Sequence, residues 1–133
     1  MKLLLNNEVS VHQFSSFGPK GVVIGNNLYC RSLIVTPKDI YSNWAPENID
    51  NITAADVQQI IKLEPELILI GTGHTLKFPH PSILRGATMA RLAVDFMDSR
   101  AACRTYNILA AENRRVAAGI IIEHSTAYKK DSS

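Results

Sequence analysis

The chain has 133 residues, of which 46% are hydrophobic and 20% charged, and its formal net charge is +2. One ordinary domain of this size buries enough apolar surface to fold without a metal or a disulfide. The near-balanced charge offers no basic surface for nucleic acid, and the apolar runs are too short for membrane insertion. The start of the chain also lacks the apolar run of a secretory signal. We therefore expect a cytoplasmic protein with a single domain over 1–123 and a polar, frayed tail over 124–133.

The first third of the chain has the pattern of extended strands. An apolar stretch at 22–24 precedes Gly25-Asn26-Asn27, and an extended pattern resumes over 28–35. Gly and Asn tolerate positive φ, so the sequence predicts a tight β-hairpin here. Residues 38–51 show little periodicity, and we interpret them as an ordered loop.

A helix is predicted to begin at Thr53. Its side chain can cap free backbone N–H groups, and Asp56 lies in the first turn, where a negative charge favours the helix dipole. Pro65 forbids continuation of the helix, and the apolar run over 66–70 then indicates a buried strand. One face of the helix is apolar and carries Ala54, Val57, Ile60 and Ile61.

The second half alternates helices and strands. Residues 81–89 favour a short helix, and the apolar and polar alternation over 92–96 is strand spacing. A longer helix opens at Asp98 or Ser99, and its apolar stripe consists of Ala102, Cys103, Tyr106, Leu109 and Ala110. Asn113 is a plausible left-handed residue after its end.

The last predicted strand, 116–122, is apolar on both faces and is therefore expected to be central. The order of elements predicts an α/β fold: a three-layer domain with helices packed on a mixed central β-sheet. The N-terminal β-hairpin is expected to extend the sheet or to cover one end of it.

Gly71-Thr72-Gly73 ends the buried strand at 66–70. A dinucleotide-binding fingerprint needs a third glycine and an immediate helix, and neither follows. A sharp turn that needs glycine is the simplest interpretation. Alternatively, Gly71 and Gly73 expose backbone N–H groups at the carboxyl end of a strand, where open α/β sheets place their ligands. A small anion could then bind at this corner, which we call the Gly-Thr-Gly corner.

Asp98 and the helix that starts beside it supply further ligand-binding candidates. Arg104 could pair with a carboxylate or phosphate, with Asn107 as an adaptable partner and Arg114 beyond the helix end. The alternative is an arginine-rich surface with ordinary ion pairs. Asn107 lies at the edge of the apolar stripe, so we expect a partly buried amide bonded to the backbone of a neighbouring loop, with 71–74 as the favoured partner.

Other residues were considered for catalytic, metal-binding and interface roles. Cys103 could form a thiolate near the helix start, but its place on the apolar stripe favours an inert core thiol. We identify no histidine spacing typical of a metal site and no Ser-His-Asp arrangement. No catalytic residue, metal or cofactor is assigned. Tyr41 and Trp44 are interface candidates because aromatic side chains carry much of the binding energy of interfaces, although Trp44 could equally close the core.

The stretch MDSRAACRTYNILAAENRRVAA over 97–118 resembles the C-terminal signature of a known domain family, and Gly71-Thr72-Gly73 and Trp44-Ala45-Pro46 match the same family. The resemblance extends over about 3–122. This family of small, largely uncharacterised domains includes bacterial and archaeal proteins, a mitochondrial respiratory complex I assembly factor and an adipogenesis-associated protein. Many members have Gly where this chain has Asn113.

The resemblance implies a three-layer α/β domain with no established enzymatic activity and no cofactor. It also implies assembly work through contacts with a protein partner, and it leaves a homo-oligomer open. We therefore expect a non-enzymatic protein-binding or assembly-factor-type domain. The alternative is a small-anion or metabolite-binding protein, conceivably a weak enzyme, that uses the Gly-Thr-Gly corner and the helix carrying Arg104 and Asn107.

Overall fold

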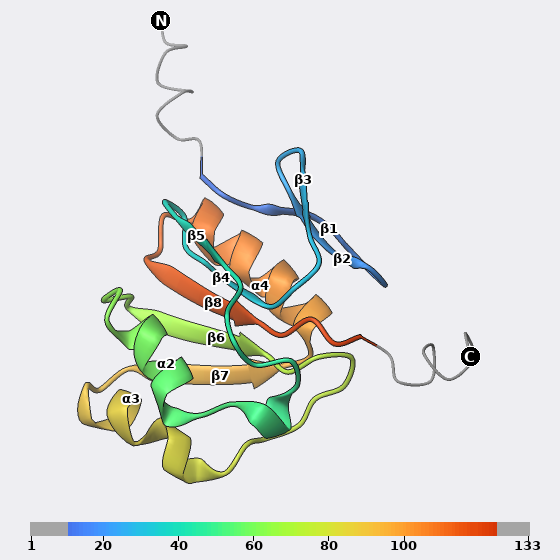
Figure 1. The fold of residues 1–133 in the computed structure, drawn as a ribbon. Coiled ribbons are helices and arrows are strands. Elements are labelled where there is room, and N and C mark those ends of the chain that lie inside the picture. Colours follow the sequence, from blue (N-terminus) through green and yellow to red (C-terminus); the bar gives the residue numbers. More distant parts are fainter. Residues whose placement is uncertain (1–10, 125–133) are drawn as a thin grey trace, which may run out of the picture.

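The computed structural model describes residues 11–124 (Figure 1). A five-stranded sheet forms the middle layer of the fold, with two helices on one face and a longer helix on the other. A separate three-stranded sheet lies beside the longer helix. The predicted three-layer α/β fold with a mixed sheet is confirmed. The extended pattern expected before residue 11 and nearly all of the expected tail lie outside the described residues.

The N-terminal strands form their own sheet. β1 (Phe14–Gly18), β2 (Gly21–Ile24) and β3 (Asn27–Tyr29) are antiparallel neighbours in that order. The predicted hairpin is confirmed, since Ile24 pairs with Asn27 and Gly25 has a φ of +63° in the turn between them. The extended pattern expected over 28–35 is interrupted after Tyr29, because the following strand belongs to the main sheet.

The main sheet has the strand order β5-β4-β8-β6-β7. β4 is antiparallel to β5 and β8, whereas β6 is parallel to β7 and β8, so the sheet is mixed. Every residue of β8 is buried, which confirms its predicted central position. The strands are β4 (Leu33–Val35), β5 (Ile40–Ser42), β6 (Leu67–Gly71), β7 (Ala93–Met97) and β8 (Val116–Ile120).

The interpretation of 38–51 as a loop is wrong in two places. The segment contains β5 at one sheet edge and the 3-10 helix η1 (Ile49–Asn51). The turn before β5 is held by Thr36, whose N–H donates to the Asp39 carbonyl at 2.9 Å and whose Oγ1 accepts from the Asp39 N–H at 2.9 Å. β5 exists because β4 pairs with it, and three residues are too few to show a strand period.

The helices begin where the sequence predicts. α2 (Ala54–Ile61) starts at a capping box in which the Asp56 N–H donates to Thr53 Oγ1 and the Thr53 N–H donates to the Asp56 carboxylate. Val57 and Ile60 are buried as expected, whereas Ala54 is exposed.

The short helix expected over 81–89 is present as the 3-10 helix η2 (Pro81–Leu84) followed by α3 (Arg85–Met89). α4 (Ser99–Ala111) starts at Asp98, whose carboxylate accepts the Ala101 N–H at 2.9 Å. Asn113 has a φ of 64°, so the predicted left-handed residue after α4 is confirmed.

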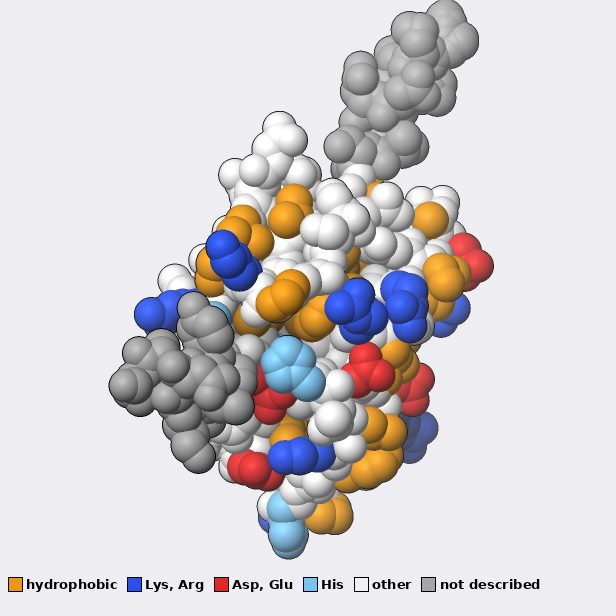
Figure 2. Space-filling model, turned by 90° about the vertical axis from the view of Figure 1, so that its right-hand side faces the viewer, with side chains coloured by type: hydrophobic (Ala, Val, Ile, Leu, Met, Phe, Trp, Pro, Cys, Tyr) orange, Lys and Arg blue, Asp and Glu red, His pale blue; other side chains and the backbone are white. Residues whose placement is uncertain are grey.

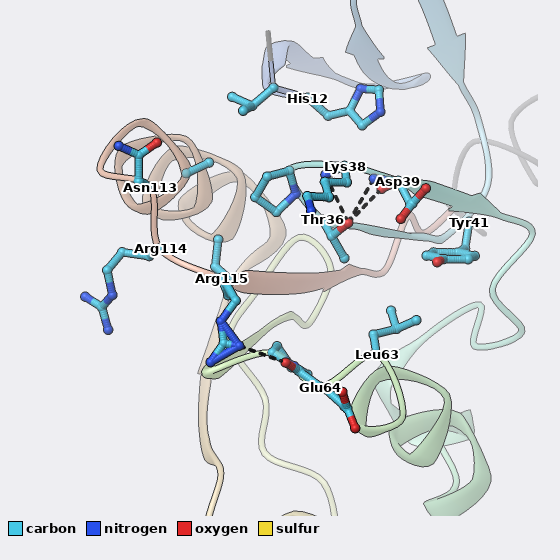
Figure 3. A pocket seen from close by; sticks show the side chains of 15 residues that line it. His12, Thr36, Lys38, Asp39, Tyr41, Leu63, Glu64, Asn113, Arg114 and Arg115 are labelled. Carbon is cyan, nitrogen blue, oxygen red and sulfur yellow. Dashed lines mark hydrogen bonds between the residues drawn. The ribbon is translucent and has the colours of Figure 1, made fainter. Parts of the chain in front are cut away.

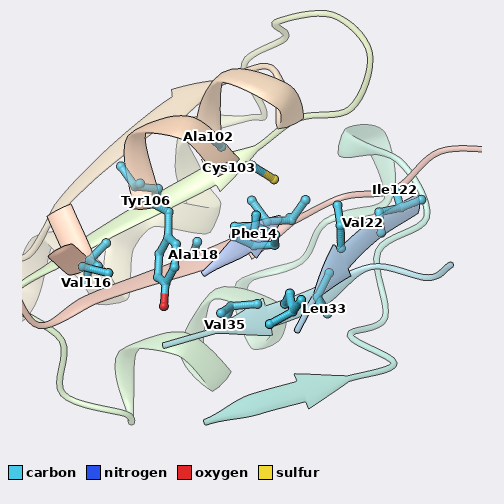
Figure 4. Close-up of a cluster of buried hydrophobic side chains, with 14 residues drawn as sticks. Phe14, Val22, Leu33, Val35, Ala102, Cys103, Tyr106, Val116, Ala118 and Ile122 are labelled. Atoms are coloured by element: carbon cyan, nitrogen blue, oxygen red, sulfur yellow. The ribbon is translucent and has the colours of Figure 1, made fainter. Parts of the chain in front are cut away.

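Alternation along the strands divides the core into two clusters, one on each face of the main sheet. Ile34 and Ile68 face α2, and Trp44 packs with them. On the opposite face, Tyr106 of α4 and Phe14 of β1 meet edge to face with ring centroids 5.3 Å apart (Figure 4). The three-stranded sheet thus completes the layer that α4 begins.

Candidate functional site

The Gly-Thr-Gly corner lies at the carboxyl end of β6, against the first turn of α4. The Gly73 N–H donates to Ser99 Oγ at 2.9 Å, and the His74 N–H donates to the Glu123 carboxylate at 2.8 Å. The Thr72 N–H donates to a backbone carbonyl of β7 at 2.8 Å. The Gly73 N–H, which the alternative interpretation left exposed for an anion, is therefore already bonded within the chain. Glu123 already provides the carboxylate that an anion would replace.

The two glycines of this corner have a packing role. A Cβ on Gly71 would lie 2.8 Å from the backbone of Ser99, and Gly73 has a φ of +107° with the Glu123 carboxylate directly over it. Ser99 Oγ also donates to the Ile121 carbonyl at 2.7 Å. The corner thus ties β6, α4 and the end of β8 together, and any larger residue would push them apart.

Asn107 is bonded to a different element from the one expected. Its Oδ1 accepts the Phe14 N–H at 2.8 Å, and its Nδ2 donates to the Phe14 carbonyl at 2.9 Å. The predicted partly buried, backbone-bonded amide is confirmed, but the favoured partner over 71–74 is wrong. The sequence does not show that β1 lies beside the middle of α4. Arg104 is exposed on the solvent side of the same helix, and Asp98 serves as its N-cap.

Arg114 takes part in a local cluster. Its Nε lies 3.1 Å from the Glu66 carboxylate, which also accepts the Arg115 N–H at 2.9 Å. The hydrogen bond from the Arg115 backbone, followed by that from Arg114, lowers the pKa of Glu66 below its ordinary value. The cluster joins the start of β6 to the start of β8.

Cys103 is a core residue, as its place on the apolar stripe indicates. It is buried in the hydrophobic cluster between α4 and the main sheet, and burial raises the pKa of its thiol to about 12. A thiol with this pKa is protonated at neutral pH, so Cys103 has no thiolate chemistry to offer.

The two aromatic interface candidates have different environments. Trp44 is 5% exposed, and its indole Nε1 donates to the Asp56 carbonyl at 3.2 Å, so it closes the core. Tyr41 of β5 is 41% exposed. Of the two residues, only Tyr41 presents a large surface to a partner.

A cleft of about 770 Å³ opens at the end of the main sheet that is opposite the Gly-Thr-Gly corner (Figure 3). It lies between the β4–β5 turn, the segment after α2 and the segment that joins α4 to β8. Its lining includes apolar residues such as Leu63 and Val116 and the charged residues Lys38, Arg115 and Glu64. Of the residues predicted from the sequence, Tyr41 and Arg114 line this cleft. The following candidates do not: Gly71, Thr72, Gly73, Arg104 and Asn107.

A smaller hollow of about 210 Å³ adjoins the cleft beside α2. Tyr41 and Leu63 line both hollows, so the two form one continuous surface around β5. We call this surface the Tyr41 groove. Sequence reasoning identified Tyr41 by its residue type but missed Leu63, Lys38 and Arg115, because they come from three separate turns that only the fold brings together.

No group of three or more His, Cys, Asp or Glu side chains within residues 11–124 could hold a metal ion. The helices within the same range are all too short or too polar to cross a membrane.

Comparison with known proteins identifies the family. The profile of a family described as "Protein of unknown function (DUF498/DUF598)" matches residues 14–121. The chain belongs to this family. The family membership that the sequence resemblance implies is thereby confirmed.

The curated relatives include proteins with different descriptions. The mouse protein named "NADH dehydrogenase [ubiquinone] 1 alpha subcomplex assembly factor 3" is 28% identical over 108 residues, which are 80% of this chain and 58% of that protein. A Francisella tularensis "13 kDa major membrane protein" is 41% identical over 75 residues, 56% of this chain and 61% of that protein. The chain thus spans about three fifths of the length of these relatives.

Solved structures share the fold. A crystal structure of a Bordetella parapertussis protein is 29% identical with a TM-score of 0.79, covering 84% of this chain and 96% of that one. A Bartonella henselae structure described as an outer membrane protein is 27% identical with a TM-score of 0.76, covering 86% and 98%. A Bordetella pertussis "Mth938-like domain", 24% identical with a TM-score of 0.78 over 90% and 92%, shows the same fold.

Proposed function

We propose that this chain is a non-enzymatic protein-binding domain with an assembly-factor-type role, and that its partner binds at the Tyr41 groove. The observation that carries the proposal is the place of Tyr41, a large aromatic side chain that is 41% exposed at a sheet edge and lines both hollows of the groove. Interfaces draw much of their binding energy from such aromatic side chains.

The family supports this choice of function. Its relatives include proteins named as assembly factors, and assembly factors act by contact with other proteins. The groove also has the mixed character of a protein interface, because apolar Leu63 and the charged Lys38, Asp39 and Glu64 all line it. A cytoplasmic, non-enzymatic role is part of the same proposal.

The test is affinity capture of the full chain from cells that express it, followed by comparison of variants. Tyr41→Ser should lose the captured partner, because the exposed aromatic ring is removed while the core is untouched. Phe78→Ser is the matched control, since Phe78 is 71% exposed on the loop after the Gly-Thr-Gly corner, away from the groove. Equal capture by both variants and the parent would refute the proposed surface. Capture of no specific partner by the parent would refute protein binding itself.

A small-anion or metabolite ligand is the second candidate, and the cleft favours it more than the Gly-Thr-Gly corner does. The cleft has a volume of about 770 Å³, which lies within the usual range of ligand pockets, and Lys38 and Arg115 line it. Titration with inorganic phosphate should then shift the NMR signals of Lys38 and Arg115 and spare those of His74. Unchanged signals at Lys38 and Arg115 would count against this candidate.

A further inference from the structure

We propose that the partner contributes an extended, acidic segment that adds to the main sheet as a new strand beside β5. This inference rests on the proposed protein-binding function and specifies the kind of partner. Strand addition is a recurring mode of peptide recognition in which backbone hydrogen bonds give affinity and side-chain hollows give specificity.

The hydrogen-bond pattern shows which backbone groups β5 offers. The Thr36 N–H donates to the Asp39 carbonyl, so these residues form a hydrogen-bonded pair next to the β4–β5 turn. Such pairs alternate along an antiparallel ladder. Tyr41, which is opposite Ile34, therefore directs its backbone groups toward β4.

Ile40 and Ser42 consequently direct their N–H and C=O groups away from β4. β5 is an outer strand of the main sheet, and neither residue is hydrogen-bonded to another segment within residues 11–124. A free strand edge of this kind is a template for pairing with a further strand. It can accept the backbone of an extended segment without disturbing β4.

Side chains beside this edge fit a strand with apolar residues. Tyr41 shares a sheet face with its partner Ile34, which belongs to the buried cluster that faces α2. Leu63 lines both hollows together with Tyr41. Figure 3 shows Tyr41 and Leu63 on opposite walls of the cleft. An added strand would place alternate side chains on this face and could bury them against both residues.

The charges around the groove favour an acidic segment. Lys38, Lys62 and Arg115 line it and form no ion pair with any residue over 11–124, whereas the lining carboxylates are Asp39 and Glu64. Unpaired cationic side chains therefore outnumber carboxylates in the lining of the groove. A segment with glutamate or aspartate between its apolar residues would therefore bind better than a basic one.

The opposite edge of the main sheet serves as an internal control. The Thr72 N–H donates to the Met97 carbonyl, so Met97 directs its backbone groups toward β6, and Val94 and Phe96 direct theirs outward. β7 is thus also a free edge. Within residues 11–124 it lacks an adjoining groove like that beside β5, and its exposed residues are Ala93 and the acidic Asp95.

The experiment measures amide hydrogen exchange of the full chain by NMR with a short peptide that alternates valine and glutamate. Binding should slow exchange at Ile40 and Ser42, leave Tyr41 unchanged because it is already bonded to β4, and spare Val94 and Phe96. A peptide that alternates valine and lysine should bind roughly fivefold more weakly at low salt, as expected for a few exposed ion pairs.

Backbone pairing is tested by methylating alternate amide nitrogens of the valine–glutamate peptide. The peptide methylated on one set of alternate amides should no longer slow amide exchange at Ile40 and Ser42. The peptide methylated on the other set should still slow it, because only alternate amides face β5. No slowing at millimolar peptide, slowing at Val94 and Phe96 instead, or equal effects of both methylation patterns would overturn the inference. If the captured partner depends on Tyr41 but leaves Ile40 and Ser42 unprotected, protein binding stands and strand addition fails.

Discussion

Replacement of Asn107 by alanine should weaken the attachment of β1 to α4 at a defined energetic cost. The side-chain amide bonds both backbone groups of Phe14, at 2.8 and 2.9 Å. Each such bond contributes about 0.5–1.5 kcal/mol net, so their joint loss should lower the free energy of unfolding by about 1–3 kcal/mol. Asn107→Leu should be no better, because the Phe14 groups would still lack a partner.

Denaturant midpoints measured for the parent and both variants test this expectation. Ile108→Ala is the matched control, because Ile108 is the next residue of α4 and is 60% exposed, so its truncation should change stability by less than about 0.5 kcal/mol. Faster amide exchange at Phe14 should accompany the lower midpoint. A midpoint for Asn107→Ala equal to that of the parent would refute the structural role of this side chain.

Other expectations follow from the packing and the pKa shifts. Iodoacetamide should rapidly alkylate the exposed Cys30 of the folded chain but not Cys103, which is buried and whose thiol pKa is raised to about 12. Rapid addition of mass at both cysteines would contradict the burial of Cys103. The folded-state pKa of Glu66 is lowered, so its stabilisation is present at neutral pH and lost as pH falls through that pKa. In the Glu66→Gln variant, the free energy of unfolding should therefore fall less steeply as the pH is lowered. The same fall as in the parent would argue against the lowered pKa of Glu66. Gly119→Ala should lower stability by about 1–3 kcal/mol, since its Cβ would lie 2.7 Å from the Trp44 ring, and an unchanged melting temperature would show that the ring can move.

Local signals in the sequence were sufficient for most of the fold. Thr53 and Asp98 mark helix starts through capping, and the apolar run in β8 indicates a central strand. β5 was missed because three residues show no period and its formation depends on β4. The N-terminal hairpin was predicted, but its packing against α4 was not, because this packing depends on contacts between residues far apart in the chain, such as Phe14 and Asn107.

The candidate site was harder to predict for the same reason. Tyr41 stands out as an aromatic residue, and Arg114 as part of an arginine cluster, but nothing local links them to Leu63 or Lys38. The cleft is made by turns at one end of the sheet, and their order in the sequence does not reveal their proximity. The sequence also leaves open whether Gly71 and Gly73 only form a turn or bind an anion, and only the structure shows Ser99 and Glu123 bonded to that corner.

Photo-crosslinking from position 41 tests the central claim most directly. The full chain would carry photoreactive benzoylphenylalanine in place of Tyr41 or, in a separate preparation, in place of Phe78, and each would be irradiated in cells that express the protein. Our account predicts a discrete crosslinked protein partner from position 41 and none from position 78. A partner crosslinked from position 78 but not from position 41 would contradict the assignment of the Tyr41 groove as the protein-binding surface.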